Sequence, residues 1–114
     1  MNKEMNAYLD HIRNDFKSWR NNVARHEIDK AIQEEMTREF CEGLVIEPGS
    51  KYLKVITTSR GGGRSVHSFV CLKDAGKFKK GDILKAASWA APARNFARGN
   101  VLEGNFGSVT WTGA

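Results

Sequence analysis

The run Arg60-Gly61-Gly62-Gly63-Arg64 is the part of the sequence best suited to hold a charged ligand. Three glycines expose backbone N–H groups and let a ligand approach closely, and the two flanking guanidinium groups can each bind a phosphate through paired hydrogen bonds. The run lacks the G-K-[ST] ending of a P-loop and does not match G-x-G-x-x-G. We predict a loop that contacts phosphate or nucleic acid; the alternative is a flexible hairpin tip kept soluble by its arginines.

Basic residues alternate with aromatic ones further along the chain. Cations can follow a phosphate backbone while rings stack on bases, so this composition favours a groove for nucleic acid. The alternative is that the rings form the core of a small sheet, because a chain with eleven large aromatic residues needs most of them inside. The alternating residues are Lys77, Phe78, Lys79, Lys80, Lys85, Trp89, Arg94, Phe96, Arg98 and Trp111. The predicted ligand-binding residues are Arg60, Gly61, Gly62, Gly63, Arg64, His67, Lys85, Trp89, Arg94, Arg98 and Asn100.

His67 is the one histidine outside the helical part, on the expected strand face of Ser65, Phe69 and Cys71. It could act as a general base. Cys71, however, would lie about 13 Å away along an extended strand, too far for a thiolate–imidazole hydrogen bond. A structural role is therefore the favoured interpretation of His67, with ligand contact as the alternative.

Catalytic and metal-binding patterns are missing from the sequence. The three histidines and two cysteines have no C-x₂-C, H-x₃-H or H-E-x-x-H spacing, and Asp74, Asp82 and Glu103 are isolated acids in the basic part. We therefore predict no enzyme activity, no catalytic residue, no metal and no cofactor. Cys41 and Cys71 are interpreted as reduced, buried thiols. No run of about 18 apolar residues and no secretory start are present, so we expect a cytoplasmic protein without membrane contact.

The charge divides the chain near Gly43. Residues 1–43 carry seven Lys and Arg against nine acids, whereas residues 44–114 carry eleven against four, together with ten of the eleven glycines. We therefore predict a helical arm at 1–43 and a basic, glycine-rich β domain at 44–114. The excess of positive charge in the second part favours an anionic partner, nucleic acid or a nucleotide-derived ligand.

The arm has the period of an amphipathic helix, since its apolar residues recur every three or four positions. The stripe changes phase after Asn21-Asn22, which fits two helices joined near 21–24 or one bent helix. Gly43 is expected to end the helical part in a left-handed conformation. The stripe is predicted to be buried, either on the sheet or in a homodimer formed through residues 5–23. Its members are Met5, Leu9, Ile12, Phe16, Trp19 and Val23.

The second part has short segments rich in β-branched and aromatic residues, separated by glycine-containing turns. We predict strands at 44–46, 51–58 and 65–72. Residues 82–88 fit a helix or a strand, and the strand is preferred. A short helix at 92–98 and two strands at 101–102 and 108–112 complete the prediction. The fold class is α+β: a helical hairpin or long bent helix, then a small, mostly antiparallel sheet with one short helix.

Residues from about 50 to 114 contain the combination S-V-H-x-F-V, W-x-A-P-A and A-R-G-N, at residues 65–70, 89–93 and 97–100. In this combination the chain resembles a group of small uncharacterised proteins of tailed bacteriophages. The resemblance implies a phage origin and expression in a bacterial cytoplasm, and it brings no known activity. Two functions follow as expectations: a phage accessory protein that holds an anionic ligand on a basic face, or a protein that binds or inhibits a host protein through the arm and sheet.

Overall fold

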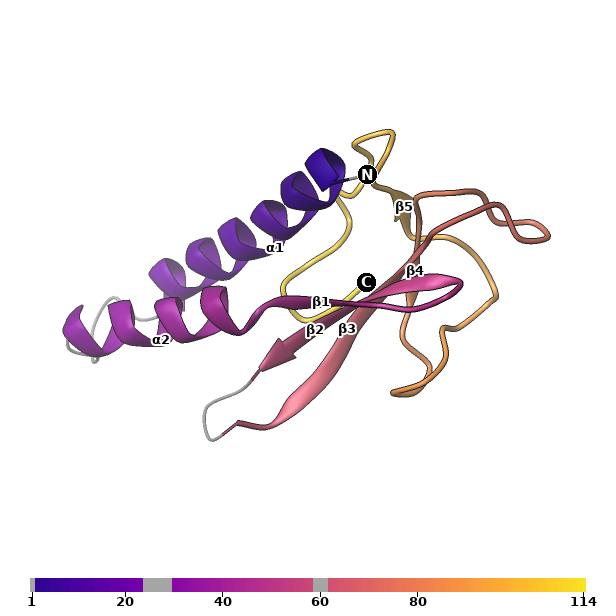
Figure 1. Ribbon diagram of the computed structural model, residues 1–114. Helices are drawn as coiled ribbons and strands as arrows, with labels where there is room; N and C mark the ends of the chain where they lie inside the picture. Colours follow the sequence, from indigo (N-terminus) through magenta and orange to yellow (C-terminus); the bar gives the residue numbers. More distant parts are fainter. Residues whose placement is uncertain (1, 24–29, 59–61) are drawn as a thin grey trace.

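The computed structural model describes residues 2–23, 30–58 and 62–114. Two helices precede a five-stranded antiparallel sheet whose strands lie side by side in chain order (Figure 1). The predicted α+β class is confirmed. The elements are α1 (Asn2–Val23), α2 (Lys30–Gly43), β1 (Val45–Pro48), β2 (Tyr52–Thr58), β3 (Arg64–Cys71), β4 (Asp82–Lys85) and β5 (Gly99–Asn100).

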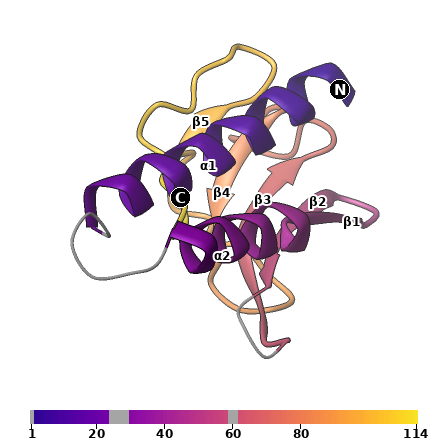
Figure 2. The same cartoon turned by 90° about the vertical axis from the view of Figure 1, so that its left-hand side faces the viewer.

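Both helices cover the same face of the sheet, and Figure 2 shows them in front of the strands. Four residues of the predicted α1 stripe, Met5, Leu9, Ile12 and Phe16, are buried against strand residues such as Val55, Val70 and Ile83, and Tyr8 is buried with them. Trp19 is 38% exposed, so the predicted burial is wrong for this residue. A homodimer is not needed to cover the four buried residues, and a homodimer through residues 5–23 stays a prediction.

A cluster of aromatic rings joins the two helices to the end of the chain. The Phe16 ring stacks on Phe40 of α2, with centroids 4.1 Å apart, and meets Trp111 edge-on at 5.1 Å. Trp19 completes the cluster at 4.8 Å from Trp111. Trp111 thus packs under the helices and does not join the predicted basic groove.

Loops, and no helix, cover the opposite face of the sheet in the part of the chain that the structure describes. A small core of Phe69, Cys71, Phe78 and Leu84 lies there, below the connections at 72–81 and 86–98. Ala97 packs against this core. We call this side the loop-covered face and the other the helix-covered face.

Gly43 ends α2 for a different reason from the predicted one. Its φ is not positive, so the expected left-handed conformation is wrong. A β-carbon at Gly43 would lie 2.9 Å from Cβ of Thr58, and the Thr58 hydroxyl donates a hydrogen bond to the Gly43 carbonyl at 3.0 Å. Glycine is needed here because α2 and β2 approach too closely for any side chain.

The predicted strand at 82–88 is correct in type but ends at Lys85, and the helix predicted at 92–98 does not form. The N–H groups of Ala93 and Arg98 donate to the carbonyls of Lys85 and Ile83, each at 2.7 Å. These long-range hydrogen bonds hold the segment beside β4 and replace the local bonds of a helix.

The two strands predicted at 101–102 and 108–112 are also wrong, and the last strand is Gly99–Asn100. The Asn100 side-chain oxygen accepts hydrogen bonds from the N–H groups of Leu102 and Glu103, at 2.8 and 3.1 Å. This contact turns the chain away from the sheet after Asn100. Residues 108–113 form turns with a single bridge between Thr110 and Gly113.

A β-bulge moves His67 away from its predicted strand face. The register slips between Val55 and Ile56, whose partners are Ser68 and Val66, so His67 has no partner across the strand pair. His67 is buried and its ring lies 6.3 Å from that of Tyr8 in α1, on the helix-covered face.

Hydrogen bonds then link α1, β3 and the end of the chain through His67. Nε2 lies 2.7 Å from the Thr110 carbonyl, which can only accept, so Nε2 carries the proton. In the neutral ring Nδ1 accepts from the Ser68 hydroxyl at 2.8 Å, and Tyr8 donates to Ser68 at 2.7 Å. Burial lowers the pKa of His67, which keeps the ring neutral. The structure therefore supports the structural interpretation of His67.

Candidate functional site

The segment at 86–98 presents two exposed aromatic rings on hydrogen-bonded loops. In the first loop, the N–H groups of Ala87 and Ser88 donate to the Ala91 carbonyl at 3.1 Å. The Ser88 hydroxyl accepts from the N–H groups of Ala90 and Ala91, at 3.3 and 3.2 Å. Trp89 lies at the tip of this turn, 46% exposed. Such a ring is displayed to solvent by a fixed backbone.

The second loop runs from Ala93 to Arg98, and the N–H groups of both residues donate hydrogen bonds to carbonyls of β4. Its tip carries Phe96, which is 53% exposed. The Asn95 side chain accepts from the Phe96 N–H at 3.0 Å, and the Lys77 ammonium donates to the Asn95 carbonyl. Exposure of Trp89 and Phe96 contradicts the alternative that these two rings are core, whereas Phe78 is buried as that alternative expected.

Cations lie over both exposed rings. The Lys54 ammonium is 4.6 Å and the Arg64 guanidinium 5.7 Å from the Trp89 centroid, and the Arg98 guanidinium is 4.1 Å from that of Phe96. Each contact is within the range of a cation–π interaction. We call the set of Lys54, Arg64, Trp89, Phe96 and Arg98 the cation–aromatic surface. The structure thus brings Arg64 of the predicted loop to Trp89, which lies 25 positions later in the sequence.

The charge of this surface is only partly balanced. The Glu47 carboxylate lies 3.9 Å from Lys54 and 3.8 Å from Arg64. Within the described ranges, Arg94 and Arg98 form no ion pair with a carboxylate. The buried Nε of Arg98 has no hydrogen-bond acceptor, so the ring of Phe96 is the main partner of this guanidinium. A positive charge held by a ring remains attractive to an anion.

A cleft of about 320 Å³ lies beside the Trp89 turn. The Lys54 ammonium reaches from β2 over Phe69, 6.0 Å from its centroid, so it lies close to both rings. Sequence reasoning missed this cleft, although a lysine in the middle of the apolar alternation at 51–58 was the available signal. The lining residues are Glu47, Pro48, Gly49, Ser50, Lys51, Tyr52, Lys54, Phe69 and Ala90.

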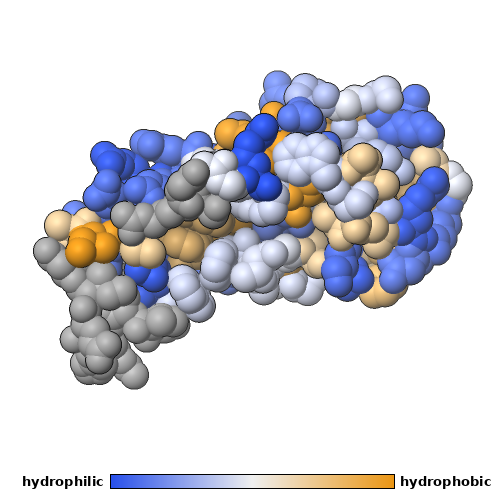
Figure 3. All heavy atoms as spheres, turned by 90° about the horizontal axis from the view of Figure 1, so that it is seen from below, coloured by the Kyte–Doolittle hydropathy of each residue, from blue (hydrophilic) through white to orange (hydrophobic). Residues whose placement is uncertain are grey.

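Seen from below in Figure 3, blue and white areas cover much of the described surface, and orange areas occur as a central strip, a spot beside the grey atoms and paler patches on the right. This view therefore has no broad apolar area of the kind that marks a hydrophobic docking face.

The structure does not bring the other predicted site residues together at one site. Arg60 and Gly61 lie outside the described residues, and Gly62 and Gly63 are exposed before β3, Gly62 with a φ of +89° in open space. Lys85 pairs in register with Ser68 and lines a separate cleft of about 380 Å³ with His67. Lys85 thus lies apart from the cation–aromatic surface.

Asn100 is buried, and its side-chain amide forms hydrogen bonds within the protein. Its amide nitrogen donates to the Asp82 carboxylate at 2.9 Å and to the Lys80 carbonyl at 3.1 Å. Its oxygen accepts the two backbone bonds of the turn that follows β5. The prediction of Asn100 as a ligand-binding residue is replaced by this structural role. Arg94 lies with its guanidinium 5.9 Å from the centroid of the buried Phe78 ring.

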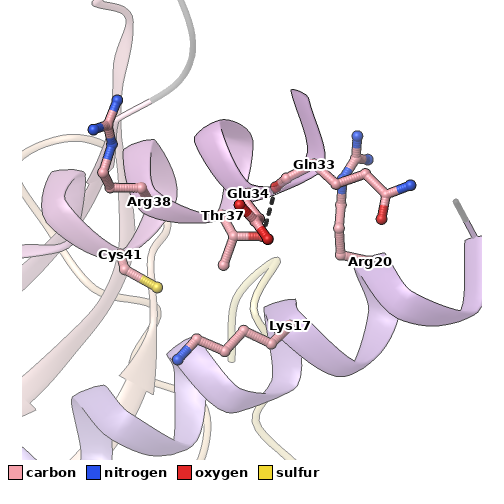
Figure 4. Close-up of a pocket in the computed structure, with 7 residues that line it drawn as sticks. All are labelled: Lys17, Arg20, Gln33, Glu34, Thr37, Arg38 and Cys41. Atoms are coloured by element: carbon pink, nitrogen blue, oxygen red, sulfur yellow. Dashed lines mark hydrogen bonds between the residues drawn. The ribbon is translucent and has the colours of Figure 1, made fainter. Parts of the chain in front are cut away.

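A larger cavity, of about 500 Å³, lies between the two helices (Figure 4). Arg20 of α1 is only 6% exposed there; it donates to the Met36 sulfur at 2.7 Å, and its Nε has no acceptor. A thioether is a weak acceptor for a buried charge. The lining mixes both charges and consists of Lys17, Arg20, Gln33, Glu34, Thr37, Arg38 and Cys41.

Residues 2–23, 30–58 and 62–114 hold no cluster of three His, Cys, Asp or Glu residues suited to a metal ion. No helix in those ranges is long and apolar enough to cross a membrane. Both cysteines are free, Cys71 buried and Cys41 only half-buried, which corrects the expectation that both are buried. Burial raises the pKa of the Cys71 thiol to about 11.

The fold and site describe a small α+β protein with one face packed under helices and one face bearing exposed rings and cations. The chain belongs to a family of unknown function, DUF7717, whose model matches residues 1–114. The match includes the helical arm, which the bacteriophage resemblance left out. No curated protein and no solved structure matches the chain. The geometry of the site therefore has to carry the functional argument.

Proposed function

We propose that the protein binds single-stranded nucleic acid on its cation–aromatic surface. The observation that carries the proposal is the position of Trp89. Its ring is nearly half exposed at the tip of a hydrogen-bonded turn, with Lys54 at 4.6 Å and Arg64 at 5.7 Å. An exposed ring with adjacent cations is the arrangement by which proteins stack on a base and hold the neighbouring phosphates.

A single strand fits these features better than a duplex. The flat faces of Trp89 and Phe96 can stack only on bases that are not already stacked within a double helix. Each stacked base contributes about 1–3 kcal/mol to binding. The side chains of Lys54, Arg64 and Arg98 are long enough to turn from a ring toward a phosphate, so they can serve both groups.

The experiment that tests the proposal is a titration of a fluorescently labelled oligothymidylate, followed by anisotropy. Replacing Trp89 and Phe96 together by alanine should weaken binding about tenfold or more, because two stacking contacts are lost. The matched control is Leu102→Ala, since Leu102 is also a large exposed apolar side chain, at 42%. The proposal fails if the parent protein does not bind, or if the double variant binds as well as the parent.

A second candidate is a module that binds another protein, and the interhelical cavity favours it. The buried Arg20 guanidinium with its unpaired Nε is suited to a carboxylate supplied by an acidic partner. This hypothesis predicts that oligonucleotides do not bind and that poly-L-glutamate raises the melting temperature. Arg20→Met should remove the increase. A phage accessory role fits either candidate and stays a prediction.

A further inference from the structure

We propose that the cleft beside the Trp89 turn holds one base of the bound strand, and that Glu47 makes guanine the preferred base. This inference rests on the proposed function and adds a base preference to it. A stack on an exposed ring accepts any base, because every base has a flat face. Sequence preference therefore has to come from hydrogen bonds to a base edge, and the cleft is where the structure places suitable groups.

The size and walls of the cleft suit one planar group. Its volume of about 320 Å³ is at the lower end of small-molecule sites. The rings of Tyr52 and Phe69 lie at one side, with centroids 5.8 Å apart and nearly perpendicular planes. The lining also includes Ala90 of the Trp89 turn and residues 48–51, at the end of β1 and in its connection to β2. Because the cleft lies beside the Trp89 turn, one nucleotide can place its base in the cleft while the base of the next nucleotide stacks on Trp89.

Among the polar side chains that line the cleft, the Lys54 donor and the Glu47 acceptor lie side by side; the others are Ser50, Lys51 and Tyr52. The Lys54 ammonium lies 3.9 Å from one Glu47 oxygen, and the Arg64 guanidinium lies 3.8 Å from the other. Both distances exceed a hydrogen bond, so these two contacts leave the carboxylate oxygens able to accept hydrogen bonds from a ligand. Arg64 and Arg98, which do not line the cleft, are placed to hold the neighbouring phosphates.

The guanine edge matches this pair in full. Guanine offers the acceptor O6 followed by the donors N1–H and N2–H. Lys54 can donate to O6 while the two Glu47 oxygens accept the two N–H groups. Adenine and cytosine each offer a single amino group beside a ring acceptor, and thymine offers a single N–H, so each leaves one Glu47 oxygen without a bond.

The test uses six-nucleotide strands of thymidine in which one central position is dG, dA, dC or dT. The parent protein should bind the dG strand about tenfold more tightly than the dT strand, as expected for a bidentate contact to one base edge. Glu47→Gln, which keeps the shape but replaces one acceptor by a donor, should reduce that ratio to about twofold or less. The readout is the ratio of the two affinities, because Glu47→Gln also removes a negative charge beside Lys54 and Arg64 and so changes the affinity for every strand.

The matched control is Glu103→Gln, which removes the same charge from an exposed acid that pairs with Lys79 instead. It should keep the preference for dG. Equal binding of all four strands by the parent protein, or an unchanged preference in Glu47→Gln, overturns the inference and leaves the proposed function standing. Failure to bind any strand overturns the proposed function as well.

Discussion

The two faces of the sheet differ in how completely their side chains are buried. On the helix-covered face α1 buries a continuous apolar stripe, and the polar groups of Tyr8, Ser68 and His67 are paired with one another. On the loop-covered face the core is small, and Trp89 and Phe96 project from loops beneath cations. One face is closed and stabilising, whereas the other keeps rings and charge available. A ligand can reach side chains only where packing is incomplete, which is the case on the loop-covered face.

Replacing a phenylalanine by aspartate should have very different effects on the stability of the protein on the two faces of the sheet. Phe16→Asp places a charge among Phe40 and Trp111 and should cost more than about 4 kcal/mol, enough to abolish cooperative unfolding. Phe96→Asp, on the exposed ring of the other face, should stay within about 0.5 kcal/mol of the parent. Urea unfolding followed by circular dichroism measures both. Similar losses of unfolding free energy in the two variants would contradict the conclusion that one face is tightly packed and the other is not.

A smaller effect is expected from Ser68→Ala, because this hydroxyl joins Tyr8 to His67 in the closed face. Its removal leaves the Tyr8 hydroxyl and His67 Nδ1 buried without these partners and should cost about 1–3 kcal/mol. Ser65→Ala is the control, since the Ser65 hydroxyl contacts Thr57 at the exposed surface. Denaturation midpoints for the two variants should differ clearly. Equal midpoints would mean that the buried hydrogen bonds contribute nothing.

The buried histidine of the helix-covered face should also make the stability of the protein depend on pH, with a smaller effect. Burial lowers the pKa of His67 in the folded protein, so the unfolded chain takes up its proton first as the pH falls. Stability should therefore decrease below about pH 6.5, the ordinary value, by at most about 1.4 kcal/mol per pH unit, until the folded-state pKa is reached. Melting temperatures from pH 7.5 to 5.5 measure it. His67→Gln should flatten the curve, and an unchanged slope would contradict the assignment.

Much of the fold could be predicted because it depends on local periodicity. The three-and-four spacing of Met5, Leu9, Ile12 and Phe16 is sufficient to predict a helix with one buried side, and alternation at 51–58 is sufficient for a strand. The bulge opposite Val55 and Ile56 could not be predicted, because it depends on how two strands register. That bulge decides the face on which His67 lies. The path of residues 93–98 depends likewise on distant carbonyls of β4.

For the candidate site, the sequence predicts which residue types take part but does not predict which of them lie together in space. The glycine-rich run indicated Arg64, and the alternation of basic and aromatic residues indicated Trp89 and Arg98. No local pattern shows that Arg64 and Trp89 meet in space. Lys54 and Glu47 were missed because each looks like an ordinary solvent-facing residue of a strand. Their proximity to the Trp89 turn exists only in the folded chain, where Lys54 of β2 lies 4.6 Å from the Trp89 ring and both Lys54 and Glu47 line the cleft beside it.

The most direct test of the account is the intrinsic fluorescence of the three tryptophans during titration with an oligothymidylate. Trp19 and Trp111 pack together on the helix-covered face, whereas Trp89 lies on the cation–aromatic surface. In the parent protein, stacking on Trp89 should quench part of the emission in a saturable way, with a steep loss of affinity as salt is raised. Trp89→Phe should leave the remaining emission unchanged by the strand. Binding without quenching in the parent protein, or equal quenching in the variant, would contradict the account.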